Sequence, residues 1–429
     1  MRRKRAAAEE AILTISSVGA RGDGIAEHGG QKLYVPLTAP ADRVRARLGE
    51  KRGEGRAAEL VEVLEKGARA PPPCPHFGRC GGCALQHLAA AAYVEAKEAQ
   101  VRAALRQHGL GSVVAEPLIR IPPGTRRRAR FAVERPRGGG PAVVGFNARA
   151  SHRIVDLDSC LVLDPALVRL AEALRAAAGT LWPKGAKGAA TATVAETGIE
   201  LLLDLADAPD LAGLEALAAF AAEQDLDRLA WRAPGVSEPV PAAIKRKPFV
   251  LLSGVAVELP PDAFLQASAE AEAALVAEVL GGAPQGAPIA DLHAGLGTFS
   301  LALIRQGSTV HAVDGARAAI ATLDAAARRS GLHRLTTECR DLEARPLLAE
   351  ELKRFEAVVF DPPRAGAAAQ AAEIARSRVV RVVAVSCNPA SFARDARLLV
   401  EGGFRLERVQ PIDQFVWSPH VELVARFAR

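Results

Sequence analysis

The sequence is poor in cysteine and contains no long apolar run. Its 429 residues include only six cysteines, too few for a disulfide scaffold in a chain of this length. No stretch stays apolar and uncharged for about 18 residues, which argues against a membrane-spanning helix. The basic start, Met1 to Arg5, is followed by alanines and glutamates, so no secretory signal is expected. We expect a cytoplasmic protein, in which clustered cysteines would be metal ligands or nucleophiles.

The composition is that of a globular chain with more than one domain. Hydrophobic residues make up 49% and charged residues 24%, and 429 residues exceed what a single core usually spans. The 55 Lys and Arg outnumber the 49 Asp and Glu, for a net charge of +6. This charge is compatible with a polyanionic partner, but many ordinary enzymes are equally basic.

Short alternating runs fill the N-terminal region. Runs such as 33–37 and 59–63 are separated by glycine-rich turns at 22–24 and 29–30. This pattern predicts a small OB-like β-barrel over residues 8–66, of a kind used to bind nucleic acid or to space other domains. A proline-rich joint leads into a cysteine-containing segment, 70–92. Mixed strand and helix patterns then predict a central α+β domain over residues 93–258.

From residue 259 to 429, apolar strands alternate with helical stretches. The expected strands are 289–292, 309–313, 357–360 and 379–385. Such alternation predicts an α/β, Rossmann-like domain, in which helices cover both faces of a mainly parallel sheet. Ligands of such sheets bind at the carboxyl ends of the strands.

The first of these strands leads into a glycine turn. Asp291 is followed by Gly295 and Gly297, and Asp314 stands about 20 residues past Gly295, where an acid meets a ribose hydroxyl in Rossmann-like sites. Ser300 occupies the place of the third glycine that makes room for a pyrophosphate. With the acidic Asp291 nearby, this favours a nucleoside cofactor that carries a sulfonium cation.

Two further strands end in reactive groups, Asp361 and Cys387. A thiolate at this edge can add to carbon 6 of a uracil and turn carbon 5 into a nucleophile toward a sulfonium methyl group. A base must then remove the carbon 5 proton so that the thiol is eliminated. Glu422 is our candidate base, with His420 as the second choice. The alternative is a buried structural cysteine.

Three cysteines lie within ten residues, at Cys74, Cys80 and Cys83, and Cys160 could supply a fourth thiol. Four thiolates suit either zinc or an iron–sulfur cluster, and the spacing alone does not choose between them. Unligated free thiols are the remaining interpretation.

Taken together, these motifs resemble the RNA uracil-5-methyltransferase family, nearest to the bacterial 23S rRNA enzymes that hold an iron–sulfur cluster. The resemblance runs through nearly the whole chain. Its motifs are the cysteine segment 74–87, Phe264-Leu-Gln266, the glycine turn 291–300, Asp361-Pro-Pro-Arg-Ala-Gly366, Ser386-Cys-Asn-Pro389 and His420-Val-Glu422.

The resemblance implies a role for each part. The barrel would be a TRAM domain that holds RNA, Cys387 the nucleophile and Glu422 the base. The implied ligands of a 4Fe-4S cluster are Cys74, Cys80, Cys83 and Cys160. The implied contacts to S-adenosyl-L-methionine are Gln266, His293, Gly295, Asp314, Asp341 and Asp361. Here His293 replaces a usual Tyr or Phe, Asp314 a usual Glu and Ser268 a common Asn, so we expect altered cofactor affinity rather than lost activity.

The expected partner is RNA, because a uridine must be unpaired or flipped out to reach both groups. The resemblance implies 23S rRNA rather than tRNA, because the cluster belongs to the ribosomal branch of the family. Arginines 126–128 and 130 and the basic run 245–247 could bind phosphates or be solvated surface. A non-catalytic iron–sulfur RNA-binding protein is an alternative, whereas the cysteine spacing is wrong for a radical enzyme that pairs TRAM with a cluster. We expect a monomer without a membrane or an obligate protein partner.

Overall fold

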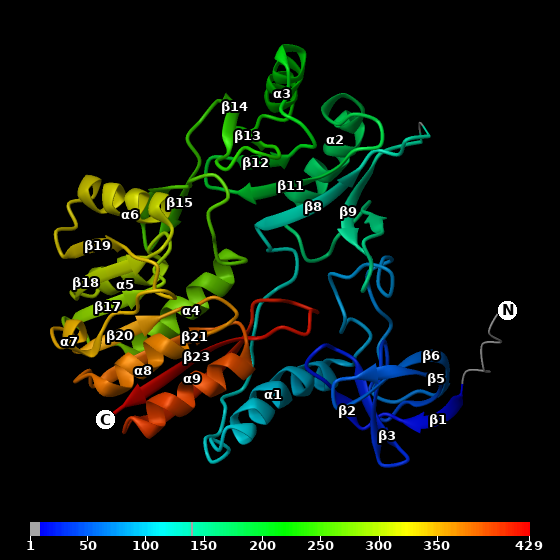
Figure 1. Cartoon of the computed structure of the whole chain (residues 1–429), viewed down its shortest axis with the longest axis horizontal. Helices are drawn as coiled ribbons and strands as arrows, with labels where there is room; N and C mark the ends of the chain where they lie inside the picture. Colours follow the sequence, from blue (N-terminus) through cyan, green and yellow to red (C-terminus); the bar gives the residue numbers. More distant parts are fainter. Residues whose placement is uncertain (1–8, 139) are drawn as a thin grey trace.

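The computed structural model describes residues 9–138 and 140–429. Three regions meet around a central junction: a small N-terminal sheet, a central sheet that carries two helices, and a large C-terminal sheet covered by helices on both faces (Figure 1). Within the described residues, no helix is both long enough and apolar enough to cross a lipid bilayer.

The N-terminal sheet is curved around a small core of its own. Its strands are β1 (Glu10–Thr14), β2 (Ser17–Val18), β3 (Gly24–His28), β4 (Gln31–Val35), β5 (Arg43–Arg52) and β6 (Gly55–Glu65), paired in the order β1-β5-β6-β4-β3-β2. Alternate residues of β1 and β5 point inward, so Leu13, Val44 and Ala46 are buried. The Ser16 backbone N–H donates to the Ile25 carbonyl oxygen at 2.8 Å. The end of β1 therefore returns to β3 near the opposite edge, as a small barrel requires.

The central sheet packs against two helices. Its strands are β8 (Arg128–Glu134), β9 (Val143–Asn147), β10 (Ile154–Asp156), β11 (Lys187–Val194), β12 (Ile199–Asp204), β13 (Arg228–Arg232) and β14 (Val240–Ile244), in the order β10-β9-β8-β11-β12-β13-β14. Asp164 and Asp210 cap the N-termini of α2 (Pro165–Leu181) and α3 (Leu211–Glu223) with their side chains. Phe131 and Trp182 lie in the shared core.

The C-terminal sheet has the order β19-β18-β17-β20-β21-β23-β22-β7. Its strands are β7 (Ile119–Arg120), β17 (Pro288–Leu292), β18 (Thr309–Asp314), β19 (Leu335–Cys339), β20 (Ala357–Phe360), β21 (Arg381–Ser386), β22 (Arg405–Asp413) and β23 (Glu422–Ala428). The strands β17 to β21 run parallel, and β23 runs antiparallel to β21. This sheet confirms the predicted α/β, Rossmann-like class.

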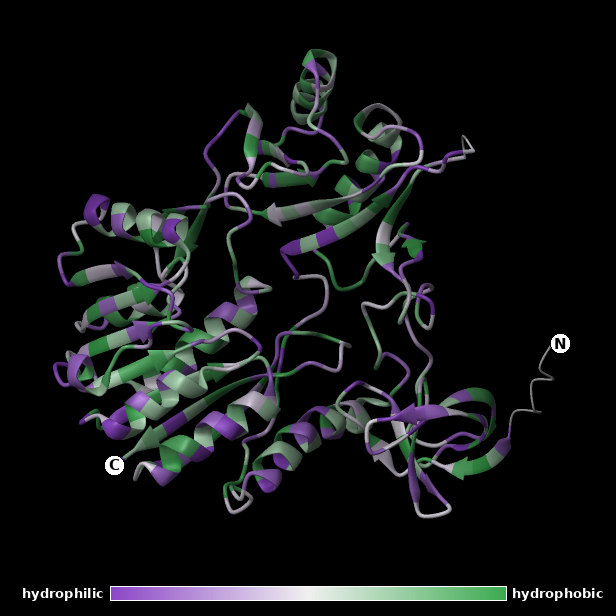
Figure 2. Ribbon diagram, in the orientation of Figure 1, coloured by the Kyte–Doolittle hydropathy of each residue, from purple (hydrophilic) through white to green (hydrophobic). Residues whose placement is uncertain are grey.

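Helices cover both faces of this sheet. α4 (Ala269–Gly282), α5 (Thr298–Arg305) and α6 (Arg317–Arg329) lie over one face, and α8 (Ala368–Arg376) and α9 (Pro389–Glu401) over the other, with the short α7 (Ala349–Leu352) beside α8. In Figure 2 the strands are mostly hydrophobic, whereas the helices alternate hydrophobic and hydrophilic residues. One face of each helix therefore packs on the sheet.

Besides β7, two segments that precede residue 259 join the C-terminal region. The helix α1 (Ala90–Gln107) packs against α9, and its Val101 and Leu105 lie in the core of the C-terminal sheet. The hairpin of β15 (Phe249–Leu252) and β16 (Val255–Glu258) packs against α6, with Val250 and Val257 buried. The predicted boundaries at residues 93 and 258 assign both segments to the central domain instead, since periodicity does not show which surface an apolar face covers.

Candidate active site

The turn after β17 forms one wall of the site. His293, Gly295 and Gly297 all have positive φ values, of 59°, 54° and 90°. At Gly297 a Cβ atom would lie 2.4 Å from a side-chain methyl of Leu323, so only glycine fits where α5 begins against α6. Because its glycines have no side chains, the turn leaves its backbone uncovered at the carboxyl ends of the strands. A non-glycine residue with positive φ, such as His293, is typical of functional turns.

The predicted ribose acceptor, Asp314, holds this turn. Its Oδ2 accepts a hydrogen bond from the Gly295 backbone N–H at 2.9 Å, and its Oδ1 accepts one from Ala316 N–H at 2.7 Å. The His293 ring lies nearby with a buried Nε2 that has no hydrogen-bond partner in the described chain. Burial lowers the pKa of His293, whereas the negative charges of Asp314 and Asp341 act in the opposite direction and raise it by less. A neutral ring therefore faces these two carboxylates.

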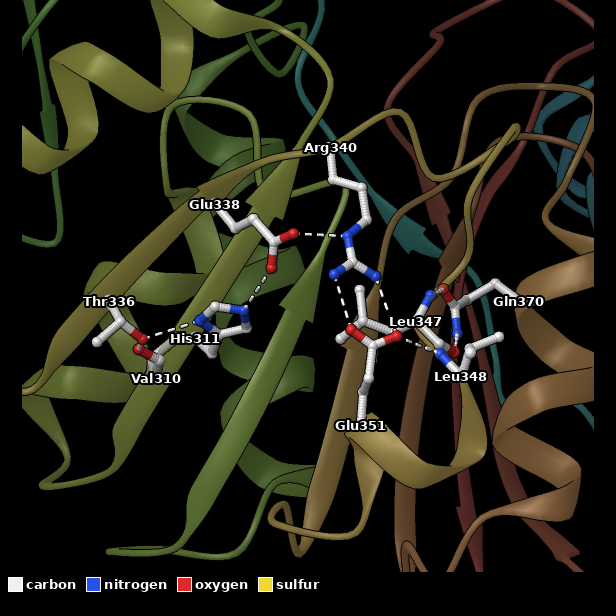
Figure 3. A network of polar contacts seen from close by, with 9 residues as sticks. All are labelled: Val310, His311, Thr336, Glu338, Arg340, Leu347, Leu348, Glu351 and Gln370. Carbon is white, nitrogen blue, oxygen red and sulfur yellow. Dashed lines mark hydrogen bonds and ion pairs between the residues drawn. The ribbon is translucent and has the colours of Figure 1, made fainter.

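A polar network supports the loop that carries Asp341 (Figure 3). Arg340 donates to both carboxylate oxygens of Glu351, at 2.7 and 3.1 Å, and to Glu338 at 2.6 Å, and Glu338 contacts His311 at 3.2 Å. The Arg340 guanidinium lowers the pKa of Glu351 to about 2. Asp341 itself is exposed, and its Oδ1 accepts from the backbone N–H groups two and three residues later. The structure thus brings Asp341 to the same edge as His293 and Asp314.

Asp291 lies fully buried beneath the turn. The Ser300 hydroxyl donates to its Oδ2 at 2.5 Å, and its Oδ1 has no hydrogen-bond partner in the described chain. Burial raises the pKa of Asp291 to about 7, with smaller contributions from the charges of Asp361 and Asp314. Ser300, which occupies the third glycine position of the motif, thus serves to hold this carboxyl group.

The carboxyl ends of β20 and β21 carry Asp361 and Cys387, as predicted. Ser386 pairs with Leu423 across β21 and β23, which places Glu422, the first residue of β23, beside Cys387. Burial, followed by the charges of Glu422 and Asp361, raises the pKa of the Cys387 thiol to about 11. The structure therefore gathers the predicted nucleophile and base at one point.

The backbone around Cys387 is held by the start of α9. The Asn388 side chain accepts from Ala390 N–H at 3.2 Å and donates to the Arg364 carbonyl oxygen at 3.0 Å. Pro389 occupies the first turn, where its missing N–H costs nothing. Cys387 lies just before a helix N-terminus, where the helix dipole favours an anion.

Asp361 and Glu422 are joined through two glutamines. Gln266 donates to Asp361 Oδ2 at 3.1 Å, and Gln414 donates to Gln266 Oε1 at 3.0 Å and to Glu422 Oε2 at 2.9 Å. Burial raises the pKa of both carboxyl groups, and the charge of Asp361 raises that of Glu422 further. Gln266 was predicted as a cofactor contact. Gln414 was not singled out from the sequence.

The loop between β22 and β23 is anchored by α1. The Tyr93 hydroxyl donates to Asp413 at 2.6 Å, and Lys97, which is fully buried, forms an ion pair with Asp413 at 2.9 Å. Lys97 also donates to the carbonyl oxygens of Phe415 and His420. Sequence patterns give no sign of these contacts, because the partners lie more than 300 positions apart.

All four predicted cluster cysteines line one cavity of about 410 Å³. It lies between the cysteine segment, the central region and the β22–β23 loop, from which Phe415 and His420 complete the wall. Ala84 and Leu85 N–H groups both donate to the Trp417 carbonyl oxygen, at 2.9 and 3.0 Å. All four cysteines are free thiols. Among the described residues, no three His, Cys, Asp or Glu side chains are grouped around a point where they could hold a single metal ion.

Hydrogen-bond donors and a cation surround these thiols. Gly82 N–H donates to Cys80 Sγ at 3.4 Å, the Gln86 side chain lowers the pKa of Cys83, and the backbone after Cys160 lowers that of Cys160. Burial, with smaller contributions from the neighbouring thiols, nevertheless raises the pKa of Cys83 to about 12. The partly buried Arg126 lines the same cavity, and no carboxylate of the described chain forms an ion pair with it. The wall therefore suits an anionic occupant.

The other basic residues that were candidate phosphate ligands are engaged by acidic side chains. The ion pairs are Arg127 with Glu272 at 2.6 Å, Arg128 with Asp262 at 2.8 Å, Arg130 with Asp204 at 2.7 Å, Lys245 with Asp225 at 2.5 Å, Arg246 with Asp227 at 2.6 Å and Lys247 with Glu258 at 3.9 Å. Their charges are thus largely balanced within the fold.

Comparison with known proteins identifies the relatives of this chain. A family model described as tRNA (Uracil-5-)-methyltransferase matches residues 255–426. An uncharacterized RNA methyltransferase of Brucella suis is 42% identical, over 96% of both chains. The 23S rRNA (uracil(1939)-C(5))-methyltransferase RlmD of Chromohalobacter salexigens is 35% identical, over 97% of this chain and 89% of the relative.

A solved structure shows the same fold. The tRNA (uracil-54, C5)-methyltransferase of Pyrococcus abyssi, in complex with S-adenosyl-L-homocysteine, aligns with a TM-score of 0.73 at 23% identity, over 97% of this chain and 100% of that chain. The motifs, the fold and these relatives agree, and the chain belongs to the family of S-adenosylmethionine-dependent RNA uracil-5-methyltransferases.

Proposed function

We propose that this enzyme methylates carbon 5 of a uridine in 23S rRNA, with Cys387 as the nucleophile and Glu422 as the base. The observation that carries the proposal is the convergence of Cys387, Asp361 and Glu422 at one edge of the sheet, where β20 and β21 end and the antiparallel β23 begins. S-adenosylmethionine supplies the methyl group. This substitution needs a thiol, a carboxylate base and a second carboxylate near the sulfonium group.

The reaction begins when the Cys387 thiolate forms a bond to carbon 6 of the uracil, and the ring electrons move toward the carbonyl oxygen. Carbon 5 would then form a bond to the methyl group while the bond between that methyl group and the sulfonium sulfur breaks and leaves a neutral thioether, and carbon 5 would become tetrahedral. Glu422 removes the remaining proton from carbon 5, and the bond between sulfur and carbon 6 breaks. The ring double bond returns and the thiolate is released, so that one proton and one methyl group have exchanged on carbon 5.

Cys387 must lose its proton before it can add to the ring. The raised pKa of the thiol in the free protein reflects burial and the two carboxyl groups beside it. A sulfonium cation near Asp361 and the N-terminus of α9 both oppose this effect. We expect the nucleophile to become active only when the cofactor is bound.

The cofactor contacts that we propose are His293, Gly295, Asp314, Asp341, Gln266 and Asp361. Their placement at one edge of the sheet supports this set, and the charges of Asp314 and Asp341 act on His293. The neutral His293 ring suits stacking next to a nucleoside. Asp314 already accepts two backbone N–H groups, but each carboxylate oxygen has a second lone pair for a ribose hydroxyl.

We further propose that Cys74, Cys80, Cys83 and Cys160 hold a 4Fe-4S cluster. Four free thiols line one cavity, and the Gly82 backbone N–H donates a hydrogen bond to Cys80 Sγ. Hydrogen bonds to cluster sulfurs are typical of such sites. The cluster, together with an N-terminal TRAM domain over residues 8–66, supports 23S rRNA as the substrate, as does the RlmD relative. Transfer RNA remains the alternative substrate, in line with the description of the matching family model.

The test is tritium release from RNA labelled at carbon 5 of uridine. Ribosomal RNA and transfer RNA would be assayed separately with S-adenosylmethionine, for wild type, Cys387→Ala and the control Cys339→Ala, which removes an exposed thiol. We expect release from ribosomal RNA alone, abolished only by Cys387→Ala. Release from transfer RNA would reassign the substrate. Absence of release from both RNAs by a cluster-loaded wild type would favour a non-catalytic iron–sulfur RNA-binding protein.

A further inference from the structure

Two buried side-chain amides lie in series between the two carboxyl groups of the site. Gln266 and Gln414 are 4% and 6% exposed, and they connect Asp361 to Glu422 through hydrogen bonds of 3.1, 3.0 and 2.9 Å. An unbroken series of hydrogen bonds therefore runs from the Asp361 carboxyl group to the Glu422 carboxyl group. Neither glutamine belongs to the chemistry of bond formation described above.

The direction of this chain is fixed by a backbone group. The Ala267 N–H donates to Gln414 Oε1 at 3.2 Å, and a backbone N–H cannot act as an acceptor. The amide nitrogen of Gln414 must therefore face Glu422 and Gln266. It follows that Gln266 presents its oxygen to Gln414 and its nitrogen to Asp361. Each carboxyl group thus receives an N–H donor, and a reversed amide would leave two acceptors facing each other.

Among the described residues, Gln414 alone donates a hydrogen bond to the Glu422 side chain. It engages Oε2, and no hydrogen bond from the described residues reaches Oε1. One oxygen of the carboxylate is thereby held while the other is left to take a proton. Glu422 is only 3% exposed, so water cannot readily replace this donor.

We propose that Gln414 is a positioning residue, which holds Glu422 in the orientation and ionised form needed to remove the carbon 5 proton, with Gln266 linking this base to the Asp361 carboxyl. The proposal rests on the proposed function, since it assigns a partner to the base named there. It predicts that loss of Gln414 slows the elimination half of the reaction more than methyl transfer.

The charged and titratable groups around Glu422 come from several elements. They are Asp361 after β20, Cys387 after β21, Asp413 at the end of β22, Lys97 and Tyr93 on α1, and Arg364 and His420 at the rim of the site. Of these, Asp361 raises the pKa of Glu422, after the larger effect of burial, while the Gln414 amide lowers it. Removal of the amide therefore shifts the ionisation of Glu422 to higher pH.

The experiment compares Gln414→Met with Gln410→Met. Methionine matches the length of glutamine but donates no hydrogen bond. Gln410 is an equally buried glutamine of β22, whose amide donates to the Pro117 carbonyl oxygen at 2.7 Å, outside the site. Three quantities are measured with carbon-5-tritiated RNA: methyl label in RNA, tritium release, and protein–RNA adduct that survives denaturation.

In Gln414→Met we expect tritium release to fall about 10- to 100-fold, the range for a lost hydrogen bond to a charged group. Methylated RNA should remain attached to Cys387 as an adduct, and the rising limb of the pH profile of release should move to higher pH. Gln410→Met should keep the wild-type profile. An equal loss of methylation and release at every pH, without adduct, would overturn the proposal, because it would indicate a merely structural role.

Two further variants separate this proposal from its premise. Gln414→Glu serves as the test if Gln414→Met does not fold. It keeps the shape of the side chain but adds a third carboxyl group, so its pH profile should also move to higher pH. Glu422→Gln tests the base directly. If Glu422→Gln lost release while both Gln414 variants matched wild type, only the role of Gln414 would be refuted. Unchanged release in Glu422→Gln would refute the base and the role of Gln414 together.

Discussion

Glu422 and His420 stand two positions apart, but their surroundings shift their pKa values in opposite senses. Burial, together with the charges of Arg364 and Lys97, lowers the pKa of His420 to about 4. Burial and Asp361 raise the pKa of Glu422 well above its usual value. A general base works best when its pKa is near the working pH. The shift therefore makes Glu422 a better base and His420 a worse one.

This difference predicts the outcome of two substitutions. Glu422→Gln should reduce tritium release about 10²- to 10⁴-fold, the usual contribution of a general base. His420→Asn should reduce it less than about 10-fold, because asparagine keeps a polar group near Arg364. Steady-state release assays with the same RNA measure both. A His420→Asn protein that loses as much as Glu422→Gln would transfer the role of base to His420.

For individual residues, the sequence was sufficient to predict that those at the ends of strands would lie together. Asp361, Cys387 and Glu422 follow or begin apolar strands, and strand ends of a parallel sheet meet at one edge. Gln414 and Arg126 could not be predicted in their roles, because those roles depend on which group lies opposite in space. Gln414 meets Gln266, 148 positions away.

Among the elements, α1 has the clearest influence on the site. Its Lys97 neutralises Asp413 and holds two carbonyl oxygens of the β22–β23 loop, and Gln100 donates to a third, that of Pro419, at 3.0 Å. Burial lowers the pKa of Lys97, and Asp413 opposes this shift. A loop without regular structure is thus fixed by one helix at both ends.

Lys97→Met should therefore release the loop and leave Asp413 buried without its cation. Breaking a buried ion pair on one side costs about 3–5 kcal/mol. We expect a lower midpoint of thermal unfolding, faster proteolysis within residues 414–421 and a large loss of methylation. Limited proteolysis followed by mass spectrometry locates the cleavage.

The matched control is Lys353→Met, which removes a lysine from the exposed ion pair with Glu350. Exposed pairs contribute about 0–1 kcal/mol, so this variant should behave as wild type. A second comparison is Lys97→Met combined with Asp413→Asn, which removes both charges and should recover part of the stability. If Lys97→Met left the loop as resistant as Lys353→Met does, α1 would not be its anchor.

Element types and their order could largely be predicted, since periodicity and glycine turns are local signals. The attachment of α1 to the C-terminal sheet could not. An amphipathic helix shows that it has an apolar face, but Val101 and Leu105 would look the same against either neighbouring region. The packing of the β15–β16 hairpin on α6 has the same explanation.

In the whole molecule, the three regions are joined next to the cysteine-lined cavity. The buried Asp23 of the barrel-like sheet forms ion pairs with Arg52 of the same sheet and with Arg149 of the central region. Cys80 pairs through its backbone with Ala148, and Trp417 of the active-site loop receives two hydrogen bonds from the cysteine segment. An occupant of the cavity would therefore contact the cysteine segment, the central region and the β22–β23 loop.

Arg126 offers a test of what that occupant is. A partly buried guanidinium that lines a cavity with four thiols, and pairs with no carboxylate of the described chain, needs a negative partner. A cluster held by four thiolates carries net negative charge, which becomes more negative on reduction, and nearby charge sets its potential.

Arg126→Gln should therefore lower the reduction potential and weaken retention of iron, whereas Arg128→Gln, which loses only the pair with Asp262, should do neither. Iron and sulfide per chain and a redox titration followed by electron paramagnetic resonance measure both effects in the anaerobically purified proteins. If both variants kept the wild-type potential and iron content, Arg126 would not be the counter-charge of a cluster. Wild-type protein that binds zinc instead of iron would assign the four thiols to a different metal, because zinc has no redox transition for the arginine to influence.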